Sequence, residues 1–359
     1  MQGLASDQSA RLAVCWGQQT LHLSCLKPST LNFKLFTFYF SLFTLHGPKL
    51  TTLTKQSNFK ERTMSKVIIV KGKGAVNEGG HLDQIRIASM YEKGIQSLFG
   101  TRQAKEGLLS LLKKNDKVGI KINTIGGRKL SSRPETSFPL ANLLADCGLT
   151  KKNIIIWDRT NRELKEAGYH LNINHDNFRI FATDTNGVGY ESQLVSHLNI
   201  GSLFSSIQTR LITASISLAV LKDHGLAGVT AGMKNYFGTI HNPNKYHISN
   251  CNPFIAELFE TKPIRKKHRL SILDALIVQY HRGPSFHSRW AAKYEALIFS
   301  LDAVAADFVG WQIIEKLRAK DGLPSLKEEQ REPVYLKTAE KMGLGKANLN
   351  EIDIIEEEA

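Results

Sequence analysis

Short β-rich runs alternate with longer helical stretches from Met64 onward, and this alternation constrains the fold more than any other feature of the chain. The expected strands are Lys66–Lys71, Lys117–Ile122, Asn153–Trp157, Phe178–Ala182, Leu211–Ser215, Leu218–Leu221, Leu270–Leu273 and Ala296–Phe299. The expected helices are Ile87–Phe99, Ala104–Lys113, Thr136–Ala145, Ile200–Ser206 and Ala303–Lys320, and Asp302 is expected to cap the last of them. Strands separated by helical segments of this length form βαβ units. The sequence therefore predicts an α/β fold with a mostly parallel sheet flanked by helices.

Polar residues follow several of the expected strands at the same end. Lys121 and Asn123 share one face where their strand ends, and Asp158 and Asp274 follow two other strands. In open parallel sheets, ligands bind outside the carboxyl ends of the strands. Each of these residues has an alternative role as a helix cap or turn former. Their repeated placement favours a ligand site at the C-terminal ends of the strands.

The segment Leu218–His241, LAVLKDHGLAGVTAGMKNYFGTIH, concentrates residue types that bind ligands. If its first residues are extended, Lys222 and His224 share one face at the end of a strand. The glycines after His224 let the backbone turn tightly and approach a ligand, while Lys234 and Asn235 add a cation and an amide. The alternative is a glycine-rich connection with solvated lysines.

The domain organisation is inferred from shifts in composition. Residues 1–63 are rich in Ser, Thr, Leu and Phe and do not resemble the rest of the chain, so we interpret them as translated upstream sequence or a leader. Residues 64–320 form the predicted α/β domain, and residues 321–359 form a charged connector, a short helix and an acidic tail. The expected location is cytoplasmic. Export is the alternative, with Leu35–Leu45 as a short apolar core that is too short to span a bilayer.

The charge of the chain favours an anionic small molecule as its partner. The formal net charge is +14, and the hydrophobic content of 42% is enough for a sizeable core. One dense basic run, Lys262–Arg269, has no nucleic-acid-binding motif beside it, so nucleic acid is not the expected partner. The sequence has neither the third glycine of a dinucleotide fingerprint nor the spacing of a Walker loop.

The positions of the cysteines and histidines limit which cofactors the chain is expected to bind. Cys147 and Cys251 stand alone and no CxxC pair exists, so no cysteine-ligated iron–sulfur cluster is expected. Half of the 12 histidines lie between His224 and His287, which makes a divalent metal an alternative ligand. The candidate metal ligands are His224, His241, His247 and Asp307.

Several of these segments resemble the domain of unknown function 362 family. The resemblance covers roughly Lys66 to Leu317 and rests on Val118–Asn123, Leu218–His241, Leu270–Asp274 and Leu297–Asp307. Its most specific residues are Lys222, His224, Thr230, Lys234 and Asn235. The resemblance implies a shared α/β domain with a shared site. Some members carry a ferredoxin-like module with iron–sulfur clusters, but this chain lacks the cysteine clusters that such a module needs.

The candidate residues suggest an anion site. The expected cationic groups are Lys121, Lys222 and Lys234, and the expected ligand-binding residues are Lys121, Asn123, Asp158, Thr230, Asn235 and Asp274. His224, Lys222 and Lys234 are the expected catalytic residues. His224 would act as the acid–base group, oriented by Asp158 or Asp274 rather than by Asp223, which projects to the opposite strand face.

The function that this pattern favours is the binding of an anionic small ligand at a Lys/His/Asn site, and an enzyme that uses His224 as its acid–base group is one hypothesis for that site. A buried lysine with a depressed pKa could serve as a base or as a Schiff-base nucleophile. One alternative is a metabolite-binding protein without catalysis. Another is a metal-binding protein that works with a redox partner and has no iron–sulfur cluster of its own.

Overall fold

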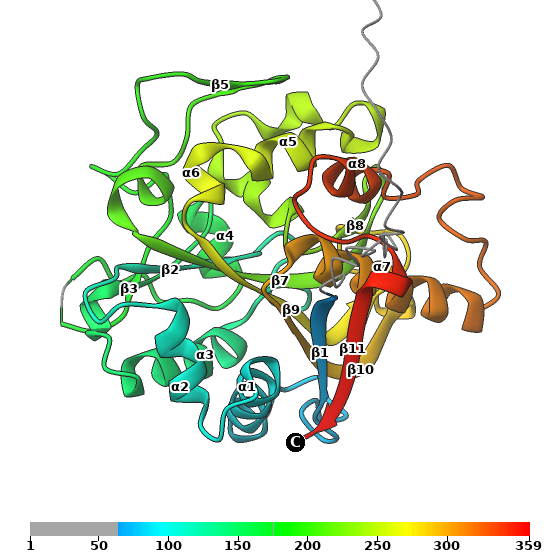
Figure 1. Cartoon of the computed structure of the whole chain (residues 1–359), viewed down its shortest axis with the longest axis horizontal. Coiled ribbons are helices and arrows are strands. Elements are labelled where there is room, and N and C mark those ends of the chain that lie inside the picture. Colours follow the sequence, from blue (N-terminus) through cyan, green and yellow to red (C-terminus); the bar gives the residue numbers. More distant parts are fainter. Residues whose placement is uncertain (1–63, 175) are drawn as a thin grey trace, which may run out of the picture. The chain divides into compact units, whose positions relative to one another are not determined.

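A nine-stranded sheet forms the centre of the protein (Figure 1). The computed structural model describes residues 64–174 and 176–359, so the expectation for residues 1–63 lies outside the described part. The strand order is β11-β1-β10-β9-β7-β2-β3-β4, with β8 paired to β7. The strands are β1 (Ser65–Lys71), β2 (Val118–Ile122), β3 (Ile154–Trp157), β4 (Arg179–Ile180), β7 (Ala214–His224), β8 (Gly228–Thr230), β9 (His268–Gln279), β10 (Ala291–Ser300) and β11 (Ile352–Glu358).

Most neighbouring strands of this sheet run parallel, which confirms the predicted fold class. The run β9-β7-β2-β3-β4 is parallel throughout, and β1 pairs in parallel with β11. Antiparallel pairing joins β10 to both of its neighbours and β8 to β7. The carboxyl ends of β2, β3 and β7 therefore meet at one edge of the sheet.

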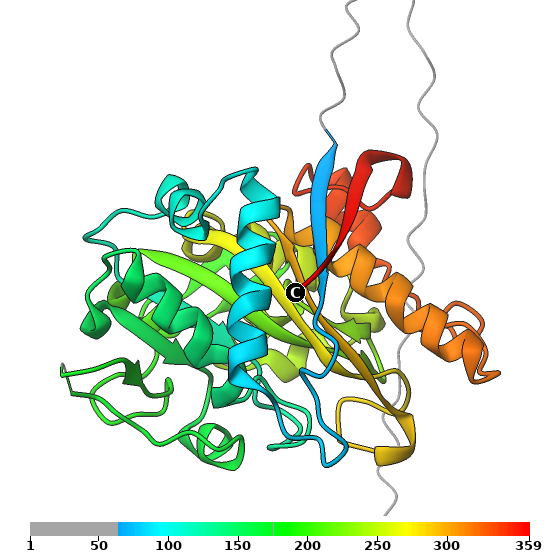
Figure 2. The ribbon, with the colours of Figure 1, turned by 90° about the horizontal axis from the view of Figure 1, so that it is seen from below.

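Helices cover both faces of the sheet and create two apolar layers. The helices are α1 (Gln84–Phe99), α2 (Ala104–Leu111), α3 (Pro134–Asp146), α4 (Asn161–Glu166), α5 (Phe254–Glu260), α6 (Lys262–Arg265), α7 (Ala303–Lys320) and α8 (Tyr335–Lys341). Along β7, Leu218 packs in the layer under α1, α2 and α3, whereas Ala219 packs in the layer under α5, α7 and α8. This alternation follows from the two-residue repeat of a strand. Figures 1 and 2 show α1 lying against the opposite face from α5.

The predicted elements differ from the structure in two places around residue 210. The end of the strand expected at Leu211–Ser215 and all of the strand expected at Leu218–Leu221 belong to one continuous strand, β7, because Ser215 and Ser217 are buried and hydrogen-bonded. Leu211 instead ends the helical turn Ile207–Leu211. The helix expected at Ile200–Ser206 is wrong. Its first residues form β6 (Ile200–Ser202), which pairs with β5 (Val195–His197) as an antiparallel hairpin.

The acidic C-terminal end is a strand rather than a free tail. β11 pairs with β1 along its whole length at the edge of the sheet, and the two strands lie side by side in Figure 2. Glu357 also forms an ion pair of 3.0 Å with Lys93. The short helix expected near Val334–Met342 is α8. Backbone pairing with β1 therefore gives this charged segment an ordered position.

Asp302 caps α7, as the sequence predicts, and also ties three segments together. Its Oδ1 accepts hydrogen bonds from the amides of Val304 and Ala305, and its Oδ2 accepts from the Ser65 hydroxyl and the Lys346 amide. Asp302→Ala is expected to lower the free energy of unfolding by about 2 kcal/mol, at the upper end of the range for lost caps.

Urea denaturation followed by circular dichroism measures this change, and Asp83→Ala is the matched control. Asp83 caps α1 through two backbone amides, and its side chain makes no other hydrogen bond within the described part of the chain. Its loss is expected to cost about 1 kcal/mol. Equal losses in the two variants would show that the bonds from Ser65 and Lys346 to Asp302 contribute nothing.

Candidate functional site

A pocket of about 250 Å³ lies at the carboxyl ends of β2, β3 and β7. Most of the site residues expected from the sequence line it. They are Lys121, Asn123, Asp158, Lys222, His224, Thr230, Lys234, Asn235 and the metal candidate His247. The strand parity that placed Lys121 beside Asn123, and Lys222 beside His224, is therefore consistent with the observed pocket.

Lys121 forms a buried ion pair at the end of β2. Its Nζ donates to Asp158 Oδ1 at 2.6 Å, to Asn235 Oδ1 at 3.1 Å and to the Ile122 carbonyl at 2.7 Å. Asp158 Oδ2 accepts from both the amide and the hydroxyl of Thr124. All three N–H groups of the Lys121 ammonium thus have acceptors, and the charge is compensated.

Asn235 binds this pair from the side, and Gly238 leaves the space that the pair occupies. The Asn235 side-chain NH₂ donates to the Lys121 carbonyl at 2.8 Å and to the Ser217 hydroxyl at 3.0 Å. A Cβ at Gly238 would lie 2.8 Å from Lys121 Nζ and 3.0 Å from Asp158 Oδ1. Only glycine therefore lets the 3-10 helix Lys234–Thr239 approach the ion pair so closely.

Lys222 is fully buried and has no carboxylate partner among the described residues. Its Nζ donates to the backbone carbonyls of Ile125 and Leu130, the latter at 3.2 Å. Burial lowers the pKa of Lys222 to about 7, and the more distant charges of Asp158 and Glu163 only partly oppose this effect. Near neutral pH, a large fraction of Lys222 is therefore an uncharged amine.

His224 is a neutral imidazole with a defined tautomer. Its Nδ1 accepts hydrogen bonds from the amides of Leu226 and Ala227, at 3.2 and 3.1 Å, so the proton is on Nε2. Burial, followed by the nearby charge of Lys234, lowers the pKa of His224 to about 2. The expectation that Asp158 or Asp274 orients this ring is wrong, because the two backbone amides occupy Nδ1.

Lys234 pairs with the second histidine of the pocket. Its Nζ lies 3.1 Å from His247 Nε2 and 4.1 Å from the centroid of the Phe237 ring. His247 Nδ1 lies 3.1 Å from the Pro243 carbonyl and donates to it, which leaves Nε2 as the acceptor. Burial lowers the pKa of Lys234 to about 8. No described carboxylate is paired with Lys234, so most of this lysine is a cation without a counter-ion at neutral pH.

Asn123 contributes an unsatisfied polar atom to the pocket. It is more than nine-tenths buried, and its side-chain Oδ1 has no hydrogen-bond partner within residues 64–174 and 176–359. Buried carbonyl oxygens are almost always paired in folded proteins. An unpaired acceptor in the wall of a pocket is therefore available to a hydrogen-bond donor on a ligand.

Comparison with known proteins identifies the family. The family model described as "Domain of unknown function (DUF362)" matches residues 118–312, which is more than half of the chain and includes most of the pocket. The chain belongs to the DUF362 family. A search of curated proteins found no match for this DUF362 protein.

Two solved structures resemble parts of this DUF362 chain. One is the lactate racemase apoprotein from Thermoanaerobacterium thermosaccharolyticum, with a TM-score of 0.39 and 12% identity over 70% of this chain and 57% of that chain. The other is a structural-genomics target from Thermotoga maritima, with a TM-score of 0.35 and 12% identity over 67% of this chain and 60% of that chain. This chain thus covers less than two-thirds of the length of either protein.

Three of the expected site residues lie outside the pocket of the DUF362 domain. Asp274 lines a separate small cavity, where its Oδ1 accepts from the Leu276 amide. Asp307 accepts from the amides of Gly232 and Met233, and His241 contacts the Tyr190 ring edge-on. Asp307 therefore holds the turn that precedes Lys234 rather than facing the pocket.

The four metal candidates are not gathered around one point. The rings of His224 and His247 stack at 5.5 Å, but Asp307 binds backbone amides and His241 packs on Tyr190. Between residues 64 and 359, position 175 aside, no group of three or more His, Cys, Asp or Glu side chains is arranged to hold a metal ion. The same residues include no helix with the length and apolarity to cross a membrane.

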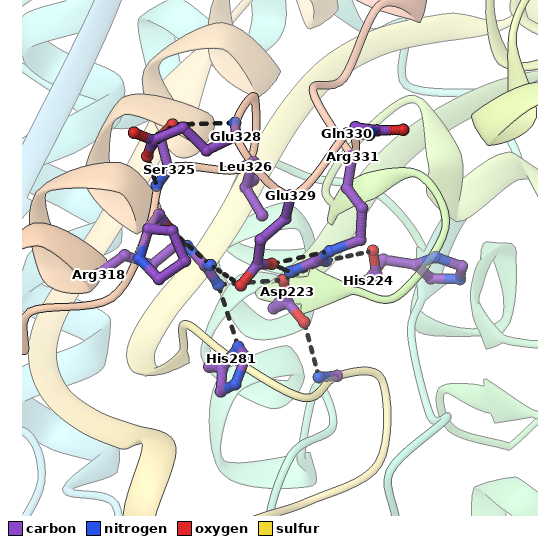
Figure 3. Close-up of polar contacts among 12 residues, drawn as sticks. Asp223, His224, His281, Arg318, Ser325, Leu326, Glu328, Glu329, Gln330 and Arg331 are labelled. Atoms are coloured by element: carbon purple, nitrogen blue, oxygen red, sulfur yellow. Dashed lines mark hydrogen bonds and ion pairs between the residues drawn. The ribbon is translucent and has the colours of Figure 1, made fainter.

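An ion-pair network surrounds Asp223, which precedes His224 in β7 and projects from the opposite face of the strand (Figure 3). Asp223 Oδ1 accepts from Arg331 at 2.8 Å, Arg331 also binds Glu329, and Glu329 is 2.7 Å from Arg318. Arg331 further donates to the backbone carbonyl of His224 at 3.1 Å. Asp223 thus points away from the pocket, as the sequence predicts, and fastens the connector after α7 to the end of β7.

Sequence reasoning missed several residues that line the pocket. Arg159 and Glu163 follow β3, Phe237 lies within the glycine-rich segment, and Asn244 precedes His247. Arg159 could have been found from its position directly after Asp158. No sequence signal marks Asn244, because a long loop brings it to the pocket.

Proposed function

We propose that this protein is an enzyme that binds a small carboxylate or phosphate compound in the lysine pocket. The observation that supports this most directly is the burial of Lys222 and Lys234 without a described carboxylate partner. Burying a charged ammonium without a counter-ion is costly. A bound anion would offset that cost.

Lys234 is the proposed anion-binding cation. With a pKa of about 8 it is mostly protonated at neutral pH, and among the residues that the structure describes only one of its three N–H groups has a hydrogen-bond acceptor, His247 Nε2. The other two are available to ligand oxygens. Unpaired Asn123 Oδ1 adds an acceptor, so the proposed ligand also carries a hydroxyl or an N–H group.

Lys222 is the proposed proton acceptor, and His224 is a neutral hydrogen-bond donor. The acid–base role expected for His224 does not suit an imidazole whose pKa is near 2, because it remains uncharged at physiological pH. Its Nε2–H can polarise a ligand oxygen in the way that other neutral active-site histidines do. Lys222, with a pKa of about 7, has the proton affinity that a base needs at neutral pH.

The pH dependence of anion binding tests this proposal. Oxalate does not change its charge between about pH 6 and pH 10, so only the protein titrates over that interval. A bound anion favours the protonated lysines and raises the pKa of each. Affinity should therefore be full below about pH 6, weaken as pH rises through about 7 and about 8, and fall by up to tenfold per pH unit for each lysine.

Isothermal titration calorimetry with oxalate gives the affinity at each pH. Lys234→Met should weaken binding at least tenfold and remove the dependence near pH 8, while Lys222→Met should remove only the dependence near pH 7. Lys245→Met is the control, because Lys245 is exposed and lies outside the pocket lining. Affinity that is independent of pH, or equal in the Lys234 and Lys245 variants, would contradict the proposed site.

A further inference from the structure

We infer that Lys222 is the nucleophile of a Schiff-base enzyme, and that the substrate is a small 2-oxo carboxylate. This inference rests on the proposed function, since it places the anionic end of the substrate on Lys234. It assigns the lone pair of Lys222 to attack on carbon instead of the proton-acceptor role proposed above, and it adds the class of substrate. We base this on the number of hydrogen-bond acceptors around each lysine of the pocket.

The three buried lysines differ in how many acceptors they have. An ammonium group has three N–H donors, whereas a neutral amine has two and a lone pair. Lys121 Nζ has three acceptors, which are the Ile122 carbonyl, Asp158 Oδ1 and Asn235 Oδ1. Lys121 is therefore fully satisfied as an ammonium, and its nitrogen is not available for reaction.

Lys222 has acceptors for a neutral amine only. The carbonyls of Ile125 and Leu130 take two hydrogens, and no third acceptor is present among the described residues. An ammonium here would keep one buried N–H unpaired, whereas a neutral amine leaves its lone pair free. Lys222 is one of the residues that line the pocket, and we place this lone pair toward an electrophilic carbon bound there.

The positions of the two carbonyls are set by a tight loop. Gly126 has a φ of +122°, and a Cβ there would lie 2.9 Å from the Leu130 carbonyl oxygen and 3.4 Å from Lys222 Nζ. The loop can therefore fold over the amine only because residue 126 is glycine. Two fixed backbone carbonyls would also stabilise the positive charge of an iminium ion at Nζ.

The remaining polar groups of the pocket fit a 2-oxo carboxylate. Lys234 has two open N–H groups for the carboxylate, His224 offers its Nε2–H to the carbonyl oxygen, and Asn123 Oδ1 can accept from the hydroxyl of the carbinolamine. The volume of about 250 Å³ suits a ligand smaller than a typical drug molecule.

The reaction is a condensation that needs no oxidant or cofactor. The Lys222 nitrogen lone pair adds to the carbonyl carbon, and the C=O π bond breaks to give a carbinolamine. The C–O bond then breaks, a C=N bond forms, and the two amine hydrogens leave with the carbonyl oxygen as one molecule of water. A proton taken from solvent converts the imine to the iminium ion.

Trapping by borohydride tests the inference on the full-length protein. Pyruvate is the probe, and sodium borohydride reduces the C=N bond to a stable secondary amine. Intact mass spectrometry is expected to show one reduced pyruvate adduct, and peptide mapping is expected to place it on Lys222. Because the map is made on the unsubstituted protein, it does not depend on whether any variant folds.

Two controls make the result specific. Lys222→Arg should lose the adduct while keeping a cation at this position, and Lys245→Arg, which alters an exposed lysine outside the pocket, should keep it. The trapping rate should rise about tenfold between about pH 6 and pH 8, because the neutral amine becomes the major form as pH rises through about 7.

The possible outcomes separate the inference from the proposed function. An adduct on Lys222 supports both. Oxalate binding without any pyruvate adduct, or with an adduct only on Lys234 or a surface lysine, overturns the Schiff-base inference and leaves anion binding intact. Failure of both oxalate and pyruvate to bind overturns the proposed function together with the inference.

Discussion

Lys121→Met is expected to lower the free energy of unfolding by about 3 to 5 kcal/mol, the loss associated with removal of one partner from a buried ion pair. Lys121 and Asp158 are 1% and 5% exposed, and their side chains are 2.6 Å apart. Without Lys121, Asp158 keeps hydrogen bonds from Thr124 and from the Arg159 amide, but it loses its paired cation. Asn235 Oδ1 would also lose its donor.

Urea denaturation measures the loss of stability in Lys121→Met and in Arg162→Met. The comparison shows whether a buried ion pair contributes more stability than an exposed one. Arg162 forms an ion pair with Glu166 on the surface of α4, where the side chains are 74% and 50% exposed, so its loss should cost no more than about 0.5 kcal/mol. A double-mutant cycle with Asp158→Asn should show strong coupling to Lys121→Met. Losses of similar size in the Lys121 and Arg162 variants would mean that the buried pair adds no stability.

The elements that depend on local sequence were predictable, and those that depend on distant partners were not. The helix Ala303–Lys320 and its cap at Asp302 match the structure, because capping and helical periodicity are local properties. In β7, the polar residues Ser215 and Ser217 interrupt the apolar pattern. They are buried because Tyr236 and the Gly232 carbonyl satisfy them from a later segment.

The same distinction applies to the pocket. The two-residue repeat of a strand was enough to place Lys222 and His224 on one face. It could not indicate that the amides of Leu226 and Ala227 would fix the tautomer of His224. Nor could it pair Lys234 with His247, because their side chains meet across a folded loop.

Histidine and aspartate content alone is also a poor guide to metal ligands in this chain. Asp307 was a candidate because its carboxylate could support a histidine metal site, but that carboxylate binds the amides of Gly232 and Met233. Burial raises the pKa of Asp307 to about 7, and Tyr335 donates a further hydrogen bond at 3.3 Å. Its role in the structure is to fix the backbone that carries Lys234 into the pocket.

Arg318→Met is expected to release the connector between α7 and α8, and to increase trypsin cleavage after Lys327 at least tenfold. Arg318 is fully buried and donates to the carbonyls of Tyr280 and Pro324 as well as to Glu329. Removing it would leave those acceptors without their cationic donor, at a cost of about 3 kcal/mol. Local opening exposes a loop to protease before the whole domain unfolds.

Release of the connector should also disturb the pocket, because Arg331 lies in the connector and binds Asp223 and the carbonyl of His224 (Figure 3). Oxalate affinity should therefore weaken in Arg318→Met, although Arg318 does not line the pocket. Lys337→Met is the control, because Lys337 is exposed and its only ion pair among the described residues is with Glu332. If cleavage accelerates while oxalate affinity is unchanged, the connector stabilises the fold without positioning His224. If neither changes, the network does not hold the connector.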